Sequence, residues 1–551
     1  MSKISTAVSA ILAAAAIGAA GAANATALVG AADHFIPTSG STALDNAIKE
    51  YLLLSGGICT APVNVYVDST SGSLTSGVHN TLVVCNATAA VSGTTIGAGD
   101  VIGIGKESNG GSLEGTLNVA RGQTLAFIDG LASGGVTCTG TTVSVTAGTN
   151  YAHQQAYSLH QGCAQSGTYA PQIGWADEIP ATWSLLGDRQ VKGSDIAALN
   201  TTPLVQNVFG IAVSLNAYRA LQKMQGLTVG DDTLANMPSL SSAVITGLYA
   251  GNLDWSLVTD SSGNNVTTFT PSTTHAPNGT NAFICRRGDS SGTNASVDLQ
   301  FMGDRCSSVG LKQTQAGGTP NGTCAGLPSG LNSYDFGCAW NTTNNLGDTV
   351  FFGSGGSDVA ACLDRHSNNN DFAIGNLTTN TAFNAPNGPG GSTDTNTSTN
   401  VHFRFVAIDS RKPTLTNVAN GLYSFVEDDV LNVSKTAGNA TSGAYGHNVP
   451  GLATYITSKT TGFASATIVA DFEGKQAQAL ASGGGAADTN WNYGVLFDAN
   501  SPNAPLQGAN TYPLSTTEVA SYPVSASSQL LAGGVLNNCQ PPATVVQTVN
   551  Q

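Results

Sequence analysis

The sequence predicts an α/β protein built from more than one domain. Short apolar runs that indicate strands alternate with segments whose apolar residues recur at helical spacing, which is the pattern of α/β lobes. About 525 residues follow a predicted N-terminal targeting segment, which is more than one domain usually holds. No internal repeat of fixed period is evident, and this argues against a solenoid.

Residues 1–25 have the features of a secretory signal peptide. Lys3 gives a positive start, an apolar run covers 7–20, and Ala23-Asn24-Ala25 offers a cleavage site. The alternative is a buried N-terminal helix. No Leu-x-Gly-Cys lipid-anchoring pattern precedes the cleavage site, and the run is too short for a transmembrane span. We therefore expect a periplasmic or secreted protein without a transmembrane segment.

Ten cysteines fit an exported protein, in which an even number indicates structural disulfides. They are Cys59, Cys85, Cys138, Cys163, Cys285, Cys306, Cys324, Cys338, Cys362 and Cys539. The sequence leaves the connectivity open, although Cys59–Cys85 and Cys138–Cys163 are plausible local pairs that would staple long loops. No C-x-x-C motif and no histidine cluster accompany them, so we expect no metal site, no redox chemistry and no cofactor.

The chain is polar but weakly charged. Only 10% of its residues are charged, and its formal net charge is −15. Nucleic acid and anionic lipid bind basic patches, so both are poor candidates as partners. Because the net charge is negative, an anion site would have to attract its ligand through local groups, against the electrostatic field of the whole chain.

The first predicted elements are a strand from Ile36, a Gly/Ser turn at 39–41 and a helix over 42–54. Apolar residues at 43, 44, 47, 48 and 51 follow the helical period. Ser41 or Thr42 is a natural N-cap for this helix.

The next regions alternate between β-rich and helical patterns. Val- and Thr-rich runs separated by Gly and Ser predict β-rich insertions over 56–100 and 132–170. A buried strand is predicted over Val208–Val213, followed by helices over 215–224 and 240–249.

A short strand over Phe283–Cys285 leads directly into segment 287–293, and a helix is predicted over 292–302. Residues 386–400 are rich in Pro, Gly, Asn and Thr, which indicates a linker or an exposed excursion.

Segment 287–293, Arg-Gly-Asp-Ser-Ser-Gly-Thr, is the richest in chemistry. A helix N-terminus offers unpaired N–H groups and the positive end of a dipole, and both suit a tetrahedral anion. Arg287 can bind an oxyanion through two nitrogens, with Asp289 as an orienting partner. Gly292 permits close approach, and the hydroxyls of its two neighbours are donors. The alternative is an ordinary capped helix beside a surface salt bridge.

This segment resembles the Arg-x-Asp-x-Ser-Gly-Thr motif of periplasmic phosphate-binding proteins that serve ABC importers. Further stretches resemble motifs of that family in the same order. They are Ser39-Gly40-Ser41-Thr42-Ala43, Glu107-Ser108-Asn109-Gly110-Gly111, Gly174-Trp175-Ala176-Asp177, Leu240 to Trp255 and Phe372-Ala373-Ile374-Gly375. The resemblance implies a two-lobed class II periplasmic-binding-protein fold with β-rich insertions. Residues 26–204 and 401–551 would form the first lobe, and residues 205–400 the second.

The resemblance also implies a ligand site in a cleft between the lobes. Its residues would be Thr42, Ala43, Ser108, Asp177, Arg287, Asp289, Ser291, Gly292 and Thr293. Asp177 can accept a hydrogen bond only from a ligand that still carries a proton, which favours phosphate over sulfate. The alternative for Asp177 is a helix N-cap or a surface acid. We expect a binding protein that closes on phosphate and delivers it to an ABC permease.

Three departures from the family leave the ligand open. Ala43 stands where the family has Phe, Trp175 replaces a small residue, and Glu107 adds an acid. That acid could repel an anion, pair with Lys106 or indicate another ligand. Two alternatives remain: a secreted phosphatase-like enzyme, and a surface or structural protein that retains the fold. No HExxH, Asp-rich or G-x-S-x-G pattern supports an enzyme. The low charge and the Cys-bracketed insertions favour the structural alternative.

Overall fold

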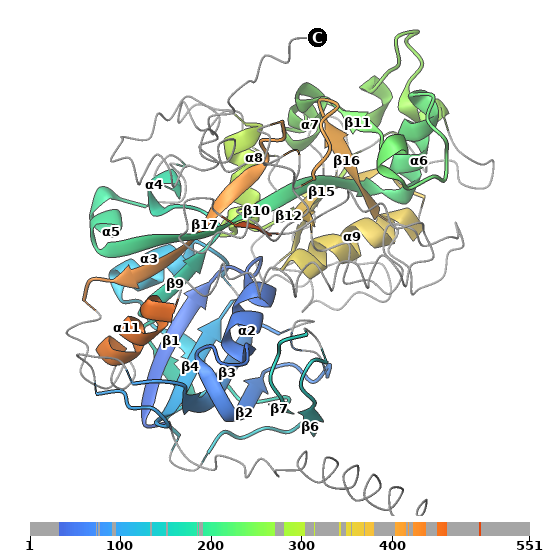
Figure 1. Cartoon of the computed structure of the whole chain (residues 1–551). Coiled ribbons are helices and arrows are strands. Elements are labelled where there is room, and N and C mark those ends of the chain that lie inside the picture. Colours follow the sequence, from blue (N-terminus) through green and yellow to red (C-terminus); the bar gives the residue numbers. More distant parts are fainter. Residues whose placement is uncertain are drawn as a thin grey trace, which may run out of the picture.

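The structure is a computed structural model with a mixed α/β fold. It describes residues 32–302 (apart from 73, 75–77, 91–94, 109, 133–134, 150–151, 184–185, 187–190, 270–279 and 281), 313, 341–342, 349–353, 355–368, 370–379, 403–414 (and 417), 422–436, 449–459 and 495–497. Figure 1 shows two bodies, one coloured blue and one mainly green and yellow, with the long strand β10 extending between them. No helix among the described residues is long and apolar enough to cross a membrane.

The first lobe is the body whose core contains Ile36, Tyr51 and Trp175. Its sheet has the strand order β17 (Val426–Ser434), β9 (Ile173–Ala176), β1 (His34–Gly40), β4 (Val101–Glu107), β3 (Asn80–Ala87), β2 (Cys59–Val67), β7 (Tyr157–His160) and β6 (Thr142–Val145). Its helices are α2 (Asp45–Leu53), α3 (Glu114–Arg121) and α11 (Val449–Lys459). Because β1 is parallel to both β4 and β9, the carboxyl ends of these three strands lie at one edge of the sheet.

The second lobe has a larger core that contains Phe209, Tyr249 and Trp255. Its strands are β11 (Ser239–Leu240), β12 (Phe283–Arg287), β13 (Asn341–Thr342), β14 (Thr349–Gly353), β15 (Ala373–Thr378) and β16 (Phe403–Ile408). Its helices are α6 (Leu215–Met224), α7 (Ser242–Tyr249), α8 (Gly292–Gln300) and α9 (Gly356–Asn368). Strand β12 is parallel to β14 and β15. It ends at Arg287, shortly before α8 begins at Gly292.

Two strands belong to both lobes. Strand β10 (Leu199–Ser214) pairs with β17 along its first half and with β15 and β16 along its second half. Leu204 of β10 lies in the first core, whereas Phe209 and Ile211 of the same strand lie in the second. Strand β17 crosses in the same way, with Val426 in the second core and Leu431 in the first.

Smaller elements surround this frame. They are the two-stranded sheet of β5 (Leu125–Phe127) and β8 (Gly167–Tyr169), the short helices α4 (Pro180–Trp183) and α5 (Gly193–Ala197), the edge strand β18 (Val495–Phe497), and the 3-10 turns η2 (Leu234–Asn236), η3 (Trp255–Leu257) and η4 (Val266–Thr268). One face of α8 carries Ala295 and Leu299, which share a small core with Trp183 of α4, with Leu186 and with Ile196 of α5. The other face contributes Val297 to the core of the second lobe, so α8 lies between the lobes.

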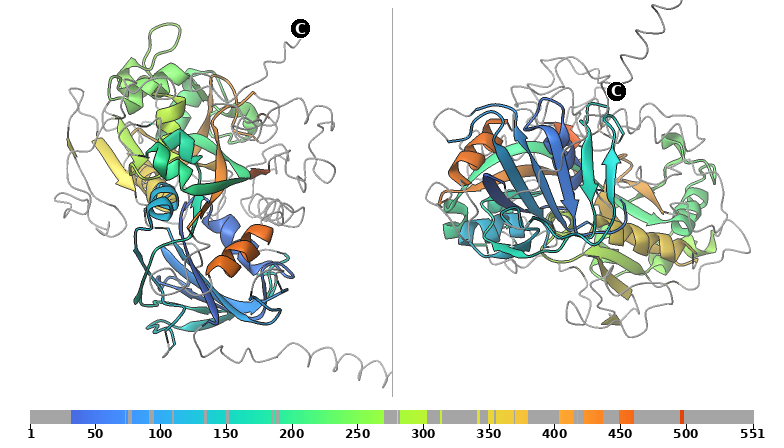
Figure 2. Two further views of the ribbon diagram at one scale, coloured as in Figure 1. Left: turned by 90° about the vertical axis from the view of Figure 1, so that its left-hand side faces the viewer. Right: turned by 90° about the horizontal axis from the view of Figure 1, so that it is seen from below.

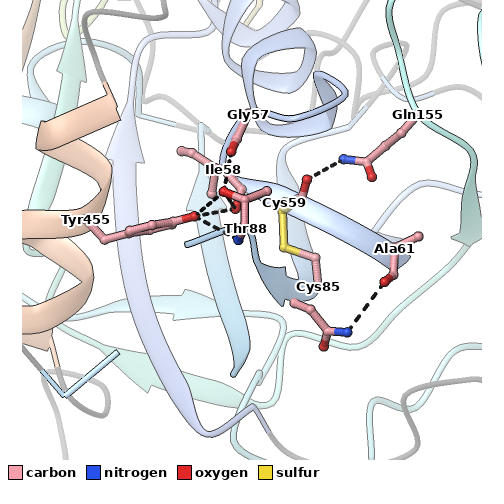
Figure 3. Close-up of a disulfide and its surroundings, with 9 residues drawn as sticks. Gly57, Ile58, Cys59, Ala61, Cys85, Thr88, Gln155 and Tyr455 are labelled. Atoms are coloured by element: carbon pink, nitrogen blue, oxygen red, sulfur yellow. Dashed lines mark hydrogen bonds between the residues drawn. A yellow bond between two sulfur atoms is a disulfide. The ribbon is translucent and has the colours of Figure 1, made fainter. Parts of the chain in front are cut away.

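Disulfides form at both expected local pairs, Cys59–Cys85 and Cys138–Cys163. The first ties β2 to β3, next to α11, which packs on the first-lobe sheet (Figure 2). Figure 3 shows Tyr455 of α11 beside this disulfide, where its hydroxyl donates to the carbonyl of Ile58 at 2.7 Å. A third disulfide, Cys285–Cys362, joins β12 to α9.

Most predicted elements lie close to their expected places, with two differences. The first helix begins at Asp45, because residues 42–44 form a turn before it. The sequence places the return to the first lobe at 401, whereas β16 pairs with β10 and β11 and its Val406 lies in the second core. The return therefore takes place along β17. The β-rich regions 56–100 and 132–170 supply β2, β3, β6 and β7 at one side of the first-lobe sheet.

Several expectations fall outside the described residues. They concern the signal peptide at 1–25, the linker at 386–400, and Cys306, Cys324, Cys338 and Cys539.

Candidate functional site

A buried polar cluster lies where strand ends of the two lobes meet. From the first lobe come the turn after β1, the turn after β4 and the end of β9. From the second lobe comes segment 287–293, between β12 and α8. Ligands of α/β proteins commonly bind at the carboxyl ends of strands, which is the position of all four segments.

Glycines let the first-lobe segments approach one another. A side chain at Gly40, whose φ is +118°, would collide with the carbonyl oxygen of Trp175. A side chain at Gly115 of α3 would meet the same carbonyl, and one at Gly174 would meet the carbonyl of Gly115. Only hydrogen in place of a side chain permits this packing of β1, β9 and α3.

Arg287 supplies a buried positive charge. It is the last residue of β12 and is 3% exposed, and its Nη1 donates a hydrogen bond to Thr42 Oγ1 at 3.0 Å. Burial lowers the pKa of Arg287, and the nearby carboxylates of Asp358, Asp177 and Asp45 oppose that shift. The hydroxyl hydrogen of Thr42 remains available to a ligand, because the hydroxyl accepts the bond from Arg287.

Asp177 follows β9 directly and is 2% exposed. Its backbone N–H donates to Ser112 Oγ at 3.2 Å. Burial raises the pKa of its carboxyl, while hydrogen bonds with Ser41 and Ser112 and the charges of Arg287 and Lys106 act in the opposite direction. Its Oδ1 is buried and has no hydrogen-bond partner among the described residues. A buried carboxylate oxygen in this position can accept a proton-bearing group of a ligand.

The start of α8 faces Asp177. A side chain at Gly292 would lie 2.8 Å from both Asp177 Oδ2 and Ser112 Oγ, so this position requires glycine. Ser291 occupies the N-cap position but makes no side-chain capping bond, which leaves its hydroxyl uncommitted to the helix. Thr293 is buried, and its carbonyl accepts a hydrogen bond from the Asn376 amide. Backbone N–H groups at this helix start are donors of the kind that bind oxyanions.

Ser108 has a different environment from the one the resemblance implies. Lys106 Nζ donates to Ser108 Oγ at 2.5 Å, and that hydroxyl donates to Asp45 Oδ1 at 3.0 Å. Lys106 also forms an ion pair with Asp45 at 2.6 Å and donates to the carbonyl of Ser41 at 3.0 Å. Ser108 thus holds the Lys106–Asp45 pair together. The suggested pairing of Lys106 with Glu107 is wrong, because Lys106 pairs with Asp45.

Two further candidates differ from expectation. Asp289 forms its ion pair with Arg286 at 2.5 Å, and its side chain is 46% exposed. The carboxylates whose charges act on Arg287 are those of Asp358, Asp177 and Asp45. Ala43 is half-buried in the turn before α2, where the neighbouring Ser41 Oγ accepts the backbone N–H of Leu44 at 3.1 Å.

The structure therefore brings seven of the nine candidates to one cluster, around Arg287 and Asp177. They are Thr42, Ser108, Asp177, Arg287, Ser291, Gly292 and Thr293. The Ser108 loop contacts segment 287–293 across the lobes. The N–H of Leu113 donates to the carbonyl of Ser290 at 3.0 Å, and a side chain at Gly111 would lie 3.2 Å from the Cα of Ser291.

Sequence reasoning missed several members of the cluster. Ser112, Asp45 and Asp358 each lie at or just before the start of a helix. Polar residues at helix starts are common capping residues, so their types alone carried no signal for a site. A stronger signal was available for Ser112, because it directly follows the Gly110-Gly111 pair of a recognised motif.

Comparisons with known proteins give a distant likeness only. No family model matches the chain, and no curated protein matches it. Among solved structures, a putative phosphate ABC transporter substrate-binding protein with bound phosphate from Clostridium perfringens is 12% identical. The match covers 82% of this chain and 97% of that one, with a TM-score of 0.32.

Two further structures are similar to the same degree. PstS from Borrelia burgdorferi is 9% identical, with 80% of this chain and 97% of that chain covered and a TM-score of 0.30. An ABC-type phosphate transport receptor from Vibrio cholerae is 14% identical, with 52% and 84% covered and a TM-score of 0.24.

Proposed function

We propose that this chain is an exported solute-binding protein that holds phosphate, or a similar protonated oxyanion, between its two lobes. The observation that carries the proposal is Asp177 Oδ1, a buried acceptor without a partner in the described part of the chain. It lies in a cluster that otherwise offers donors to an anion: the Arg287 guanidinium, the hydroxyls of Thr42 and Ser291, and the start of α8.

The balance of donors and acceptor favours a ligand that is negative but still carries a proton. Arg287 and the N–H groups of α8 would bind the ligand's bare oxygens. Asp177 would accept the one remaining proton of HPO₄²⁻ or H₂PO₄⁻. Sulfate has no proton to donate at neutral pH, so two acceptors would face each other at a cost of about 1–3 kcal/mol or more.

Lys106 does not compete for this role. Its charge is compensated by Asp45 and its hydrogen bonds are taken up by Gly40, Ser41 and Ser108. Arg287 therefore has to supply the cation that offsets the charge of the ligand. Delivery of the ligand to an ABC permease, and a location in the periplasm or outside the cell, are parts of the same proposal.

Calorimetry with phosphate, arsenate and sulfate tests this function. We expect the first two to bind and sulfate not to bind. Asp177→Asn replaces the acceptor by an amide whose N–H donates, so it should weaken phosphate binding about tenfold or more and let sulfate bind.

Asp289→Asn is the matched control, since Asp289 is half exposed and pairs with Arg286. We expect its phosphate affinity to equal that of the unaltered chain. If none of the three anions binds to the folded protein, the proposal is wrong; if a chromogenic phosphomonoester is turned over and Arg287→Ala abolishes the turnover, the chain is an enzyme instead.

A further inference from the structure

The disulfide between β12 and α9 has a histidine beside it. Cys362 and His366 lie one turn apart on α9, so both face the same way, and Cys285 lies opposite them in β12. A ligand atom of each of the three residues lies within 4.8 Å of those of the other two. All three are buried, at 0%, 3% and 7% exposure for Cys285, Cys362 and His366. No other such group of His, Cys, Asp or Glu occurs in the described part of the chain.

The imidazole of His366 has a carboxylate partner on one ring nitrogen, as metal-binding histidines commonly do. Its Nδ1 lies 2.9 Å from Asp371 Oδ2, and the backbone N–H of Asp371 donates to the carbonyl of His366 at 2.8 Å. A carboxylate on one ring nitrogen fixes the orientation of the ring and leaves the other nitrogen for a metal. The ring of Phe283 lies against the imidazole, with 4.2 Å between centroids, and covers it.

From this arrangement we propose that, once the Cys285–Cys362 disulfide is reduced, the two thiolates and His366 bind a zinc ion. A dithiol reductant supplies two electrons and two protons, the S–S bond breaks, and two S–H groups form while the reductant becomes a disulfide. Zinc binding then releases the two thiol protons to solvent as two Zn–S bonds and one Zn–N bond form.

The geometry suits this ion. Zinc takes Cys sulfur at about 2.3 Å and His nitrogen at about 2.0 Å in tetrahedral sites, so its ligand atoms lie roughly 3.3–3.8 Å apart. Reduction frees the two sulfurs to move apart to that spacing, and the three ligand atoms already lie within 4.8 Å of one another. The fourth position would be taken by water. Zinc and the disulfide would thus be alternative cross-links between the same strand and helix.

The chain contains its own control. Cys59 and Cys85 form a disulfide that is equally buried, at 0% exposure each, but no histidine belongs to a ligand group with them in the described residues. The groups drawn around that pair include the side chains of Tyr455, Thr88 and Gln155 and several backbone carbonyls (Figure 3). Reduction should therefore create a zinc site at one pair and not at the other.

The test is zinc-dependent protection from alkylation. The full chain is reduced, incubated with or without Zn²⁺, treated with N-ethylmaleimide, and analysed by peptide mass spectrometry. We expect Zn²⁺ to slow alkylation of Cys285 and Cys362 at least tenfold, with no change at Cys59 and Cys85. Equal protection at both pairs, or at neither, overturns the proposal.

Two variants that keep the disulfide separate ligation from folding. His366→Ala should abolish the protection, and Asp371→Asn should lower the Zn²⁺ affinity about 10- to 100-fold, as loss of a partner to a metal-bound histidine usually does. Both are checked in the oxidised form for an unchanged circular dichroism spectrum. Co²⁺ in place of Zn²⁺ should give a thiolate charge-transfer band in the reduced chain, and its persistence in His366→Ala at full intensity counts against the histidine as a ligand.

Discussion

At the scale of single residues, Asp177 is an acidic residue whose side chain is deeply buried. Burial raises the pKa of its carboxyl from the usual 3.8. Between the unfolded pKa and this higher folded pKa, the folded chain holds a proton that the unfolded chain has lost, so stability falls as the pH rises through that range. Above the folded pKa the carboxyl is charged in both states, and the full cost of burying that charge lowers the stability of the folded chain.

We therefore predict that Asp177→Asn stabilises the ligand-free protein at neutral pH. The gain should vanish below pH 3.8, where the carboxyl is protonated in both states. Urea unfolding at pH 7.5 and at the lowest pH at which the chain stays folded measures the difference. A variant less stable than the original at pH 7.5 would contradict a net penalty from this carboxylate.

Some site residues could be found from sequence and others could not. Arg287, Asp177 and Gly292 stand in short motifs whose residue types already suit an oxyanion. The pairing of Lys106 with Asp45 joins residues 61 positions apart, so it follows from the parallel pairing of β1 and β4 and from no local pattern. The partner of Asp289 could not be chosen from sequence either, because Arg286 and Arg287 are adjacent on a strand and point to opposite faces.

At the scale of elements, α11 packs into the first core and is also hydrogen-bonded to the first lobe through the hydroxyl of Tyr455. The Tyr455 hydroxyl donates to the carbonyl of Ile58, lies 2.7 Å from Thr88 Oγ1 and accepts the Thr88 N–H at 3.1 Å. We predict that Tyr455→Phe lowers the free energy of unfolding by about 1 kcal/mol, because Ile58 O and Thr88 each lose one hydrogen bond and keep the one between them. Thermal unfolding at neutral pH measures this loss, and an unchanged midpoint would show that the hydroxyl bonds are not needed.

The four predicted helices correspond to α2, α6, α7 and α8, and α6 occupies the predicted range 215–224, whereas α3, α9 and α11 were not predicted. Strand β10 is much longer than its predicted core, Val208–Val213, since it begins at Leu199. Its first half contains Pro203, which lacks an N–H group, and the pairing with β17 shifts register between Pro203 and Val205. Because the register shifts at this proline, the first half of β10 has no regular alternation of apolar and polar residues from which a strand could be predicted.

At the scale of the whole molecule, the cluster is closed over by contacts between the lobes. The bond from Leu113 N–H to Ser290 O and the close approach of Gly111 to Ser291 both cross from one lobe to the other. On the proposed function, a ligand enters only when these contacts open, with β10 and β17 as the connection that bends.

We predict that added phosphate lowers the radius of gyration measured by small-angle X-ray scattering. Gly111→Val should prevent that decrease, because a side chain there would lie 3.1 Å from Ser290 O. Gly72→Val is the matched control, since Gly72 has a similar φ of +75° and no atom within 4 Å of an added Cβ. The proposed closure fails if the scattering of the unaltered chain is the same with and without bound phosphate.

The α/β class and the presence of two lobes followed from the sequence, but the boundary between the lobes did not. Apart from Arg404, strand β16 is apolar, and an apolar strand fits either core equally well. Its place in the second lobe is decided by pairing with β10 and β11, which lie far away in sequence.

The shared strand β10 has a consequence for how such a chain can change over generations. Leu199 to Val208 pair with β17 and Phe209 to Val213 pair with β15, so a cut within either stretch separates part of the strand from the lobe it completes. A recombination break within β10 would therefore remove strand pairing from at least one lobe, which makes exchange of a single lobe unfavourable.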